Sequence, residues 1–157
     1  MSDELVFMMG KFAARIPTDR RYAPNHMWLR PEGDVLRVGL TAYAVRLLLE
    51  IYFLEWNVAE GDPIKQKAEI GAVESAKATA AIYAPASGTV ARLNPAALAD
   101  PGIINRDCYG SGWLMEMAGC DDGTMEPQQY VEFLGQSWEK AQALLKNRRS
   151  ENRETKP

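Results

Sequence analysis

The chain has 157 residues, of which 46% are hydrophobic and 25% charged, and this composition fits one globular domain with a hydrophobic core. A second, catalytic domain has no room at this length. The longest apolar run near the start, residues 5–9, is short and follows two acidic residues, so it predicts neither a signal peptide nor a membrane span. We therefore expect a cytoplasmic protein.

The net charge of −3 is unevenly distributed along the chain. Residues 11–37 carry +3 and residues 140–157 carry +4, whereas residues 38–139 carry −8. Such asymmetry can steer a charged protein partner toward one face, although an ordinary solvated surface is the simpler explanation. With a pI of 5.3 and little interleaving of basic and aromatic residues, nucleic acid is not an expected partner.

Cysteine and histidine are scarce. Cys108 and Cys120 are too few for a disulfide framework, and a bridge between them is not expected in a reducing compartment. Together with His26, the single histidine, they fall short of the four ligands of a closed zinc site. No metal is expected.

The first third of the chain predicts an extension, a hairpin and a helix. Residues 1–23 form an N-terminal extension of uncertain structure with a turn at residues 17–19. Residues 27–30 and 35–40 are predicted strands, because a Pro- and Gly-containing turn separates them. Thr41 is a natural N-cap for a helix over residues 42–49, where apolar side chains recur four residues apart.

The remaining elements follow in order. Strands are predicted at residues 51–56, 89–93 and 113–117, with a short helix or turn at 95–98 and an irregular stretch at 107–112. An amphipathic helix from Pro127 to about Lys146 carries an apolar stripe, expected to pack on the body. The stripe consists of Tyr130, Phe133, Leu134, Trp138, Ala141, Leu144 and Leu145. The main domain thus spans residues 24–149, and the polar residues 150–157 are predicted to be a disordered tail.

Residues 71–88 contain one lysine, Lys77, between two strand-like runs. Val73 precedes it, and Thr79, Ala81 and Tyr83 follow at alternate positions, which is typical of a half-buried strand. The turn of this hairpin is therefore expected near Lys77, with small residues that leave the amine unobstructed. For a single lysine taken alone, a solvated loop tip is the simpler interpretation.

Several motifs resemble those of the glycine cleavage H proteins, a family of lipoyl carriers. ESAKA at residues 74–78, followed by YAPASGTV at 83–90, is similar to the family's lipoyl-attachment hairpin. HMWL at 26–29, VGLT at 38–41 and NRDCYGSGWL at 105–114 resemble further family motifs in the same order. The resemblance implies a mainly β fold, the lipoyl-type barrel-sandwich hybrid, with a short internal helix and a C-terminal amphipathic helix outside.

The resemblance also implies the chemistry of Lys77. A lipoate ligase or lipoyl transferase would join lipoate to Lys77 as an amide, and the chain would act as a carrier and not as an enzyme. Glu74, Ser75, Ala76 and Ala78 would be recognised by the attaching enzyme, although each also fits ordinary turn composition. Biotin is the closest competing modification, but methionines usually flank a biotinyl lysine, and alanines flank Lys77.

Four other residues have candidate roles around the arm. His26 and Cys108 are candidate contacts of the tethered group, and Cys108 could exchange with its sulfurs. A locally packed histidine and a buried, inert cysteine are the simpler alternatives. Gly61 and Gly88 are expected to permit positive φ in turns on either side of the hairpin.

Some departures from the H-protein pattern bear on the pathway. Residues 49–57 lack the family's glycine and proline, Cys108 replaces a proline, and residues 7–22 extend the start. These departures resemble the lipoate-binding proteins of the heterodisulfide-reductase-like sulfur oxidation system. That similarity implies a carrier of sulfur or electrons in cytoplasmic sulfur oxidation, with a heterodisulfide-reductase-like complex and dihydrolipoamide dehydrogenase as partners.

Three alternatives remain. A glycine cleavage H protein would carry an aminomethyl group between glycine decarboxylase and aminomethyltransferase. An unmodified protein-interaction module would leave Lys77 free. A cysteine enzyme that uses Cys108 and His26 is the least favoured.

Overall fold

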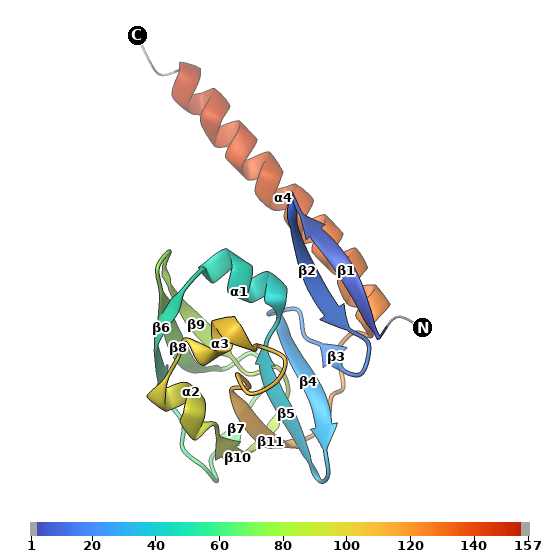
Figure 1. Ribbon diagram of the computed structural model, residues 1–157, viewed down its shortest axis with the longest axis vertical. Helices are drawn as coiled ribbons and strands as arrows, with labels where there is room; N and C mark the ends of the chain where they lie inside the picture. Colours follow the sequence, from blue (N-terminus) through green and yellow to red (C-terminus); the bar gives the residue numbers. More distant parts are fainter. Residues whose placement is uncertain (1–2, 155–157) are drawn as a thin grey trace.

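The computed structural model describes residues 3–154, with side chains up to residue 143. The chain is mainly β and forms a six-stranded, a three-stranded and a two-stranded sheet, with three short helices and one long C-terminal helix (Figure 1). This is the lipoyl-type fold that the motifs predict.

The six-stranded sheet has the order β3-β4-β5-β11-β10-β7. Its strands are β3 (Arg21–Tyr22), β4 (Met27–Glu32), β5 (Val35–Leu40), β7 (Pro63–Ile64), β10 (Gly88–Leu93) and β11 (Met115–Gly119). The predicted strands at 27–30, 35–40 and 89–93 are confirmed. The last strand begins two residues later than predicted, because the amide of Trp113 still bonds to Gly110 within the preceding turn.

The three-stranded sheet has the order β6-β8-β9, with β8 in the centre. Its strands are β6 (Ile51–Trp56), β8 (Glu69–Ser75) and β9 (Thr79–Tyr83). Apolar side chains from this sheet and from the six-stranded sheet form the main hydrophobic core, which includes Val38, Val73 and Met117. The predicted strand at 51–56 and the predicted hairpin around Lys77 are both confirmed.

Short helices connect the strands. Helix α1 (Ala42–Leu48) begins where predicted, because the Thr41 hydroxyl accepts a hydrogen bond from the amide of Ala44. Helix α2 (Pro95–Ala99) was also predicted, whereas the single turn of α3 (Ile103–Arg106) was not.

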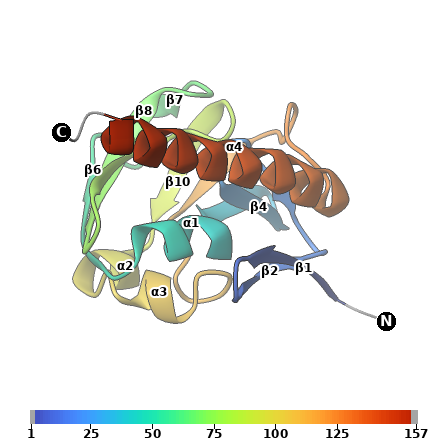
Figure 2. The ribbon, with the colours of Figure 1, turned by 90° about the horizontal axis from the view of Figure 1, so that it is seen from above.

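The N-terminal extension forms a hairpin that the sequence did not predict. Strands β1 (Glu4–Met9) and β2 (Phe12–Pro17) pair only with each other. They lie alongside the first part of α4 (Pro127–Glu154), and β2 also packs against α1 (Figures 1 and 2). A second, aromatic cluster joins these elements; its buried members are Met9, Ala14, Ile16, Tyr22, Trp28, Tyr43, Trp113, Tyr130 and Leu134.

Helix α4 differs from its prediction at its end. Tyr130 and Leu134 are fully buried as expected, but Ala141 is exposed because the helix has by then left the body (Figure 1). The helix continues to Glu154, whereas the sequence predicted a tail from residue 150. Polar residues such as Glu and Arg extend an existing helix at little cost. Residues 155–157 and the side chains of Leu144 and Leu145 lie outside the described part.

Within residues 3–154, no helix is both long enough and apolar enough to cross a membrane.

Candidate functional site

Lys77 lies on the turn between β8 and β9, as predicted. The backbone bends at Ala76 and Lys77, and both residues and Ala78 are exposed. Among the described residues, no ion pair holds the Lys77 amine. The amine is therefore accessible to a modifying enzyme.

Ser75 shapes this turn from within. Its side chain is buried, and its Oγ donates to the carbonyl of Ala78 over 2.8 Å. The same Oγ accepts from the amides of Ala78, at 3.2 Å, and Lys77, at 3.4 Å. The Ser75 hydroxyl is therefore used inside the turn, and recognition of Ser75 by the attaching enzyme stays a prediction. Ala76 and Ala78 are exposed, and Glu74 is half-buried.

A second anchor comes from the segment between α1 and β6. The amide of Ala76 donates to the carbonyl of Glu50 over 2.8 Å. Asn105 holds this segment in turn, because its Nδ2 donates to Leu49 O over 2.7 Å and its Oδ1 accepts from the Ile51 amide over 2.8 Å. Sequence reasoning missed this positioning role of Asn105, although the residue opens one of the family-like motifs.

Strand β9 has one outer and one buried face. Thr79 and Tyr83 are exposed and Ala81 is half-buried, whereas Ile82 faces the main core at 3% exposure. The half-buried strand is confirmed, but the residues singled out lie on its outer face. The bulkier Ile82 determines which face is buried, since a strand alternates its side chains strictly.

Exposed apolar side chains surround the turn. Tyr52 and Phe53 on β6 are 59% and 45% exposed, and Phe53 pairs with Glu74 two strand positions before the turn. Leu49, beside the Glu50 anchor, is 44% exposed. The lysine thus stands at the edge of an apolar surface with a carboxylate near it.

His26 lies away from the turn. Its carbonyl accepts from the Thr41 amide at the start of α1, whereas Glu50 follows the end of that seven-residue helix, about 10 Å away. The His26 Nδ1 lies 3.0 Å from the Tyr130 hydroxyl, and its ring packs on Tyr43. Burial lowers the pKa of His26 to about 4, so the ring is neutral at pH 7. The structure therefore places His26 in the aromatic cluster.

Cys108 is also a packed residue. Burial, followed by the negative charge of Asp107, raises the pKa of its thiol to about 11, so it is not the thiolate that exchange needs. It lines a cavity of about 400 Å³ with Leu49 and Glu50. Its backbone carbonyl accepts from Trp28 Nε1. Cys108 and Cys120 are both free thiols.

The two glycines near the hairpin have different roles. Gly61 has φ +92°, which confirms the predicted turn role. Gly88 has no positive φ; it lies in β10, where a Cβ would collide with the carbonyl oxygen of Ala118 on β11. The expected positive φ at Gly88 is therefore wrong, and close strand approach explains the glycine.

Comparisons with known proteins identify the family. Residues 20–143 match the family model described as "Glycine cleavage H-protein". A probable glycine cleavage system H protein of Natronomonas pharaonis is 42% identical over 107 residues, which are 68% of this chain and 84% of that protein. A glycine cleavage system H protein of Gloeobacter violaceus is 40% identical over 125 residues, or 76% and 96% of the two chains.

A solved structure agrees with these relatives. The crystal structure of a glycine cleavage system H protein from Mycobacterium marinum superposes with a TM-score of 0.68 at 34% identity, covering 78% of this chain and 98% of that one. Proteins of this family carry a lipoyl group on a lysine and are not enzymes. The chain belongs to the glycine cleavage H-protein family and is a lipoyl carrier.

Proposed function

We propose that Lys77 is the lysine that carries the lipoyl group. The observation that supports this most directly is the turn itself: Lys77 is exposed between two alanines, while Ser75 and Glu50 hold the backbone on either side. Such an arrangement exposes the amine to a ligase or transferase, and it fixes the backbone to which the arm would be attached. Bound there, the lipoyl group would supply a disulfide that can be reduced, loaded and reoxidised.

Intact mass after expression with a lipoate ligase tests the attachment. We expect the mass of one lipoyl group on the wild-type chain and on Lys65→Arg, a matched change outside the turn. Lys77→Arg should gain none. Lipoylation of Lys77→Arg, or an unmodified wild-type chain, would contradict the proposal and favour an unmodified interaction module.

The names of the relatives favour the glycine cleavage system as the source of the group that the arm carries. We infer an arm that takes an aminomethyl group from glycine decarboxylase, passes it to aminomethyltransferase and is reoxidised by dihydrolipoamide dehydrogenase. The matched relatives at about 40% identity all bear this system's name. The sequence motifs had favoured sulfur oxidation, and the comparisons support the aminomethyl carrier better.

Sulfur transfer stays as a second candidate because of one observation. The β1–β2 hairpin lies outside the family match at residues 20–143, and it contains the stretch that resembles lipoate-binding proteins of sulfur oxidation. On this hypothesis the arm carries sulfur or electrons to and from a heterodisulfide-reductase-like complex in the cytoplasm.

One assay separates the two cargoes. The lipoylated chain is incubated with glycine decarboxylase and labelled glycine, and label on the arm is followed by mass spectrometry. Efficient loading supports the aminomethyl carrier. Absence of loading, with an authentic H protein loaded in parallel, supports the sulfur carrier.

A further inference from the structure

The second half of α4 leaves the body of the protein. Trp138 packs on Tyr43 of α1 with ring centroids 6.5 Å apart, and the described side chains that follow it, at residues 139–143, are all exposed. The backbone continues as a helix to Glu154, about 24 Å beyond Trp138 at a rise of about 1.5 Å per residue. Residues 139–154 therefore form a projecting helix.

The projecting helix rises from the same end of the molecule as the β8–β9 turn (Figure 1). Seen from above, it runs toward the side of the body that holds β6 and β8 (Figure 2). Helix α1 connects the two features, because its Tyr43 contacts α4 and the Glu50 carbonyl after its end accepts from the Ala76 amide in the turn. A protein that approaches Lys77 from this end is therefore also next to the projecting helix.

The sequence of the projecting helix does little to stabilise it in isolation. Arg148 and Glu151 are its only oppositely charged pair at a spacing of three or four, whereas Arg149 and Arg153 repel each other at a spacing of four. Residues 144–154 also lie beyond the family match, which ends at residue 143. Because most helices in proteins gain their stability from packing of one face, this helix is suited to packing on a partner.

The charge of the projecting helix indicates the kind of partner. Residues 140–154 contain five basic and two acidic residues, which gives +3, whereas residues 38–139 carry −8. An acidic protein surface is attracted by the helix and repelled by most of the body, so its approach is oriented. Leu144 and Leu145 are the only apolar residues in 144–154, too few for a helix that lies in a membrane surface.

Exposed apolar side chains lie near the turn on α1 and β6. Leu47 and Leu49 are exposed at the end of α1. On β6, a register shift in the pairing with β8 forms a bulge next to the turn, and Tyr52 and Phe53 are both exposed there. A docked protein can bury these side chains beside Lys77.

We propose that the projecting helix, the exposed end of α1 and the β8–β9 turn form one docking surface for the enzyme that loads the lipoyl arm. That enzyme presents an acidic patch to the helix and apolar side chains to α1 and β6. Dihydrolipoamide dehydrogenase is common to both cargo routes, whereas the loading enzyme differs between them, so an element beyond the family match fits the loading enzyme. The inference rests on lipoylation of Lys77.

Loading kinetics of the full-length, lipoylated chain test this surface. Glycine decarboxylase of the same organism loads the arm from labelled glycine; if it does not, the heterodisulfide-reductase-like complex with a sulfane sulfur donor replaces it. Arg149→Gln combined with Arg153→Gln removes two charges and keeps a good helix former at both positions. We expect the KM for the chain to rise at least fivefold with kcat unchanged, and its salt dependence to become weaker.

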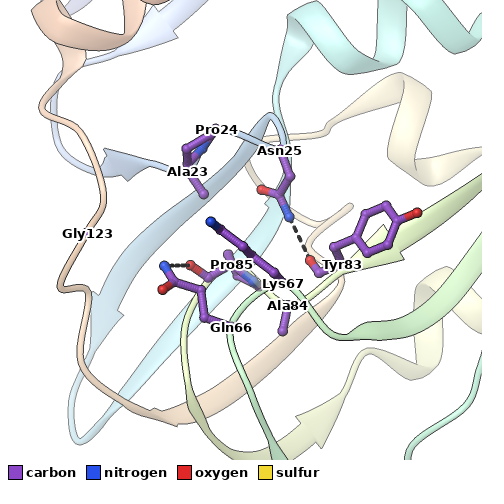
Figure 3. A pocket seen from close by; sticks show the side chains of 9 residues that line it. All are labelled: Ala23, Pro24, Asn25, Gln66, Lys67, Tyr83, Ala84, Pro85 and Gly123. Carbon is purple, nitrogen blue, oxygen red and sulfur yellow. Dashed lines mark hydrogen bonds between the residues drawn. The ribbon is translucent and has the colours of Figure 1, made fainter.

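Two further variants separate charge from geometry. Lys65→Gln combined with Lys67→Gln removes the same charge at the opposite end of the β8–β9 hairpin, where Lys67 lines a pocket of about 650 Å³ (Figure 3). This control should change KM less than twofold. Ala143→Pro keeps every charge but breaks the helix beyond its packed part, and it should raise KM as the double arginine substitution does.

The proposal is overturned if KM is the same in the arginine variant and the lysine control. If KM is unchanged and the wild-type chain self-associates, or binds phosphatidylglycerol vesicles or RNA, the helix serves that contact instead. Intact mass reports lipoylation of every variant, so a failed docking surface is distinguished from a failed carrier. If neither enzyme loads the lipoylated wild-type chain, the proposed function fails, and the docking surface fails with it.

Discussion

Two hairpins of this protein are held in place by different means. In the β8–β9 hairpin, β8 pairs on both sides, and the Ser75 hydroxyl and the Glu50 carbonyl fasten the turn. The β1–β2 hairpin has no third strand and is held by side chains packed on α4 and α1. A two-stranded sheet is marginal alone, so this packing is essential to it.

The difference suits the two positions. A turn that carries a modified lysine has to expose its side chains, so its order comes from backbone hydrogen bonds. The N-terminal hairpin exposes no such group and is ordered by buried aromatic rings, among them Tyr22 stacked on Tyr130 with centroids 4.6 Å apart. Substitutions should therefore affect the two hairpins independently.

The largest expected effect follows removal of the ring that joins α4 to the aromatic cluster. Tyr130→Ala should lower the free energy of unfolding by about 3–5 kcal/mol and make residues 1–17 sensitive to proteases. Tyr130→Phe keeps the ring and should cost about 1–3 kcal/mol, because it leaves His26 Nδ1 and the Thr41 hydroxyl without this partner. Urea unfolding and limited proteolysis measure both. An intact N-terminal hairpin in Tyr130→Ala would contradict its dependence on the cluster.

Acid should weaken the same cluster. The folded pKa of His26, about 4, lies below its ordinary value of 6.5, so the neutral ring stabilises the fold above pH 6.5. This stability, at most about 3 kcal/mol, should be lost as pH falls from 6.5 toward 4. His26→Asn tolerates the positive φ at this position and does not titrate. The difference in free energy of unfolding between the wild-type chain and His26→Asn should shrink as the pH falls. A constant difference would show that His26 does not contribute to the pH dependence of stability.

A smaller effect is expected in the β8–β9 hairpin. Ser75→Ala removes the hydroxyl that organises the turn and should cost about 1–2 kcal/mol. Lipoylation of Lys77 should also slow, because the turn loosens. Ser87→Ala is a matched control, since Ser87 Oγ accepts one amide hydrogen bond from Gln66 away from the turn. Mass spectra taken over time should show a normal lipoylation rate for Ser87→Ala. Equal rates for both variants would contradict the role of the Ser75 hydroxyl in shaping the turn.

The smallest effect concerns Lys67 at the entry to β8. Lys67→Gly should leave stability unchanged or raise it by up to about 1 kcal/mol, because glycine adopts φ +74° without strain. Lys65→Gly, at a position without positive φ, should instead lower stability by about 0.5–1 kcal/mol. Thermal melts compare the two, and a clear loss in Lys67→Gly would mean that the lysine side chain stabilises the fold.

The sequence predicted those elements whose patterns are local. Thr41 capping α1, the strand at Ile51–Trp56 and the turn at Lys77 each rest on neighbours in the chain. It did not predict β1 and β2, because their partner α4 lies more than a hundred residues away and their short apolar runs have no local signal. The role of Asn105 was missed for the same reason, because its bonds to Leu49 and Ile51 depend on the assembled fold. The bonds of Ser75 to residues 77 and 78 are local, and a serine at the start of a turn is a signal that could have predicted them.

The pairing of β1 and β2 with α4 also has a consequence for folding. The hairpin leaves the ribosome before the helix, so the aromatic cluster can close only after α4 has been made. At about 5–20 residues per second, the apolar face of the hairpin waits several seconds for its partner. Contacts between segments that are distant in sequence are also slow to form. The body around Lys77 can therefore fold before the cluster closes. A chain that lacks α4 would have a formed attachment turn, but the apolar face of its β1–β2 hairpin would be exposed to solvent.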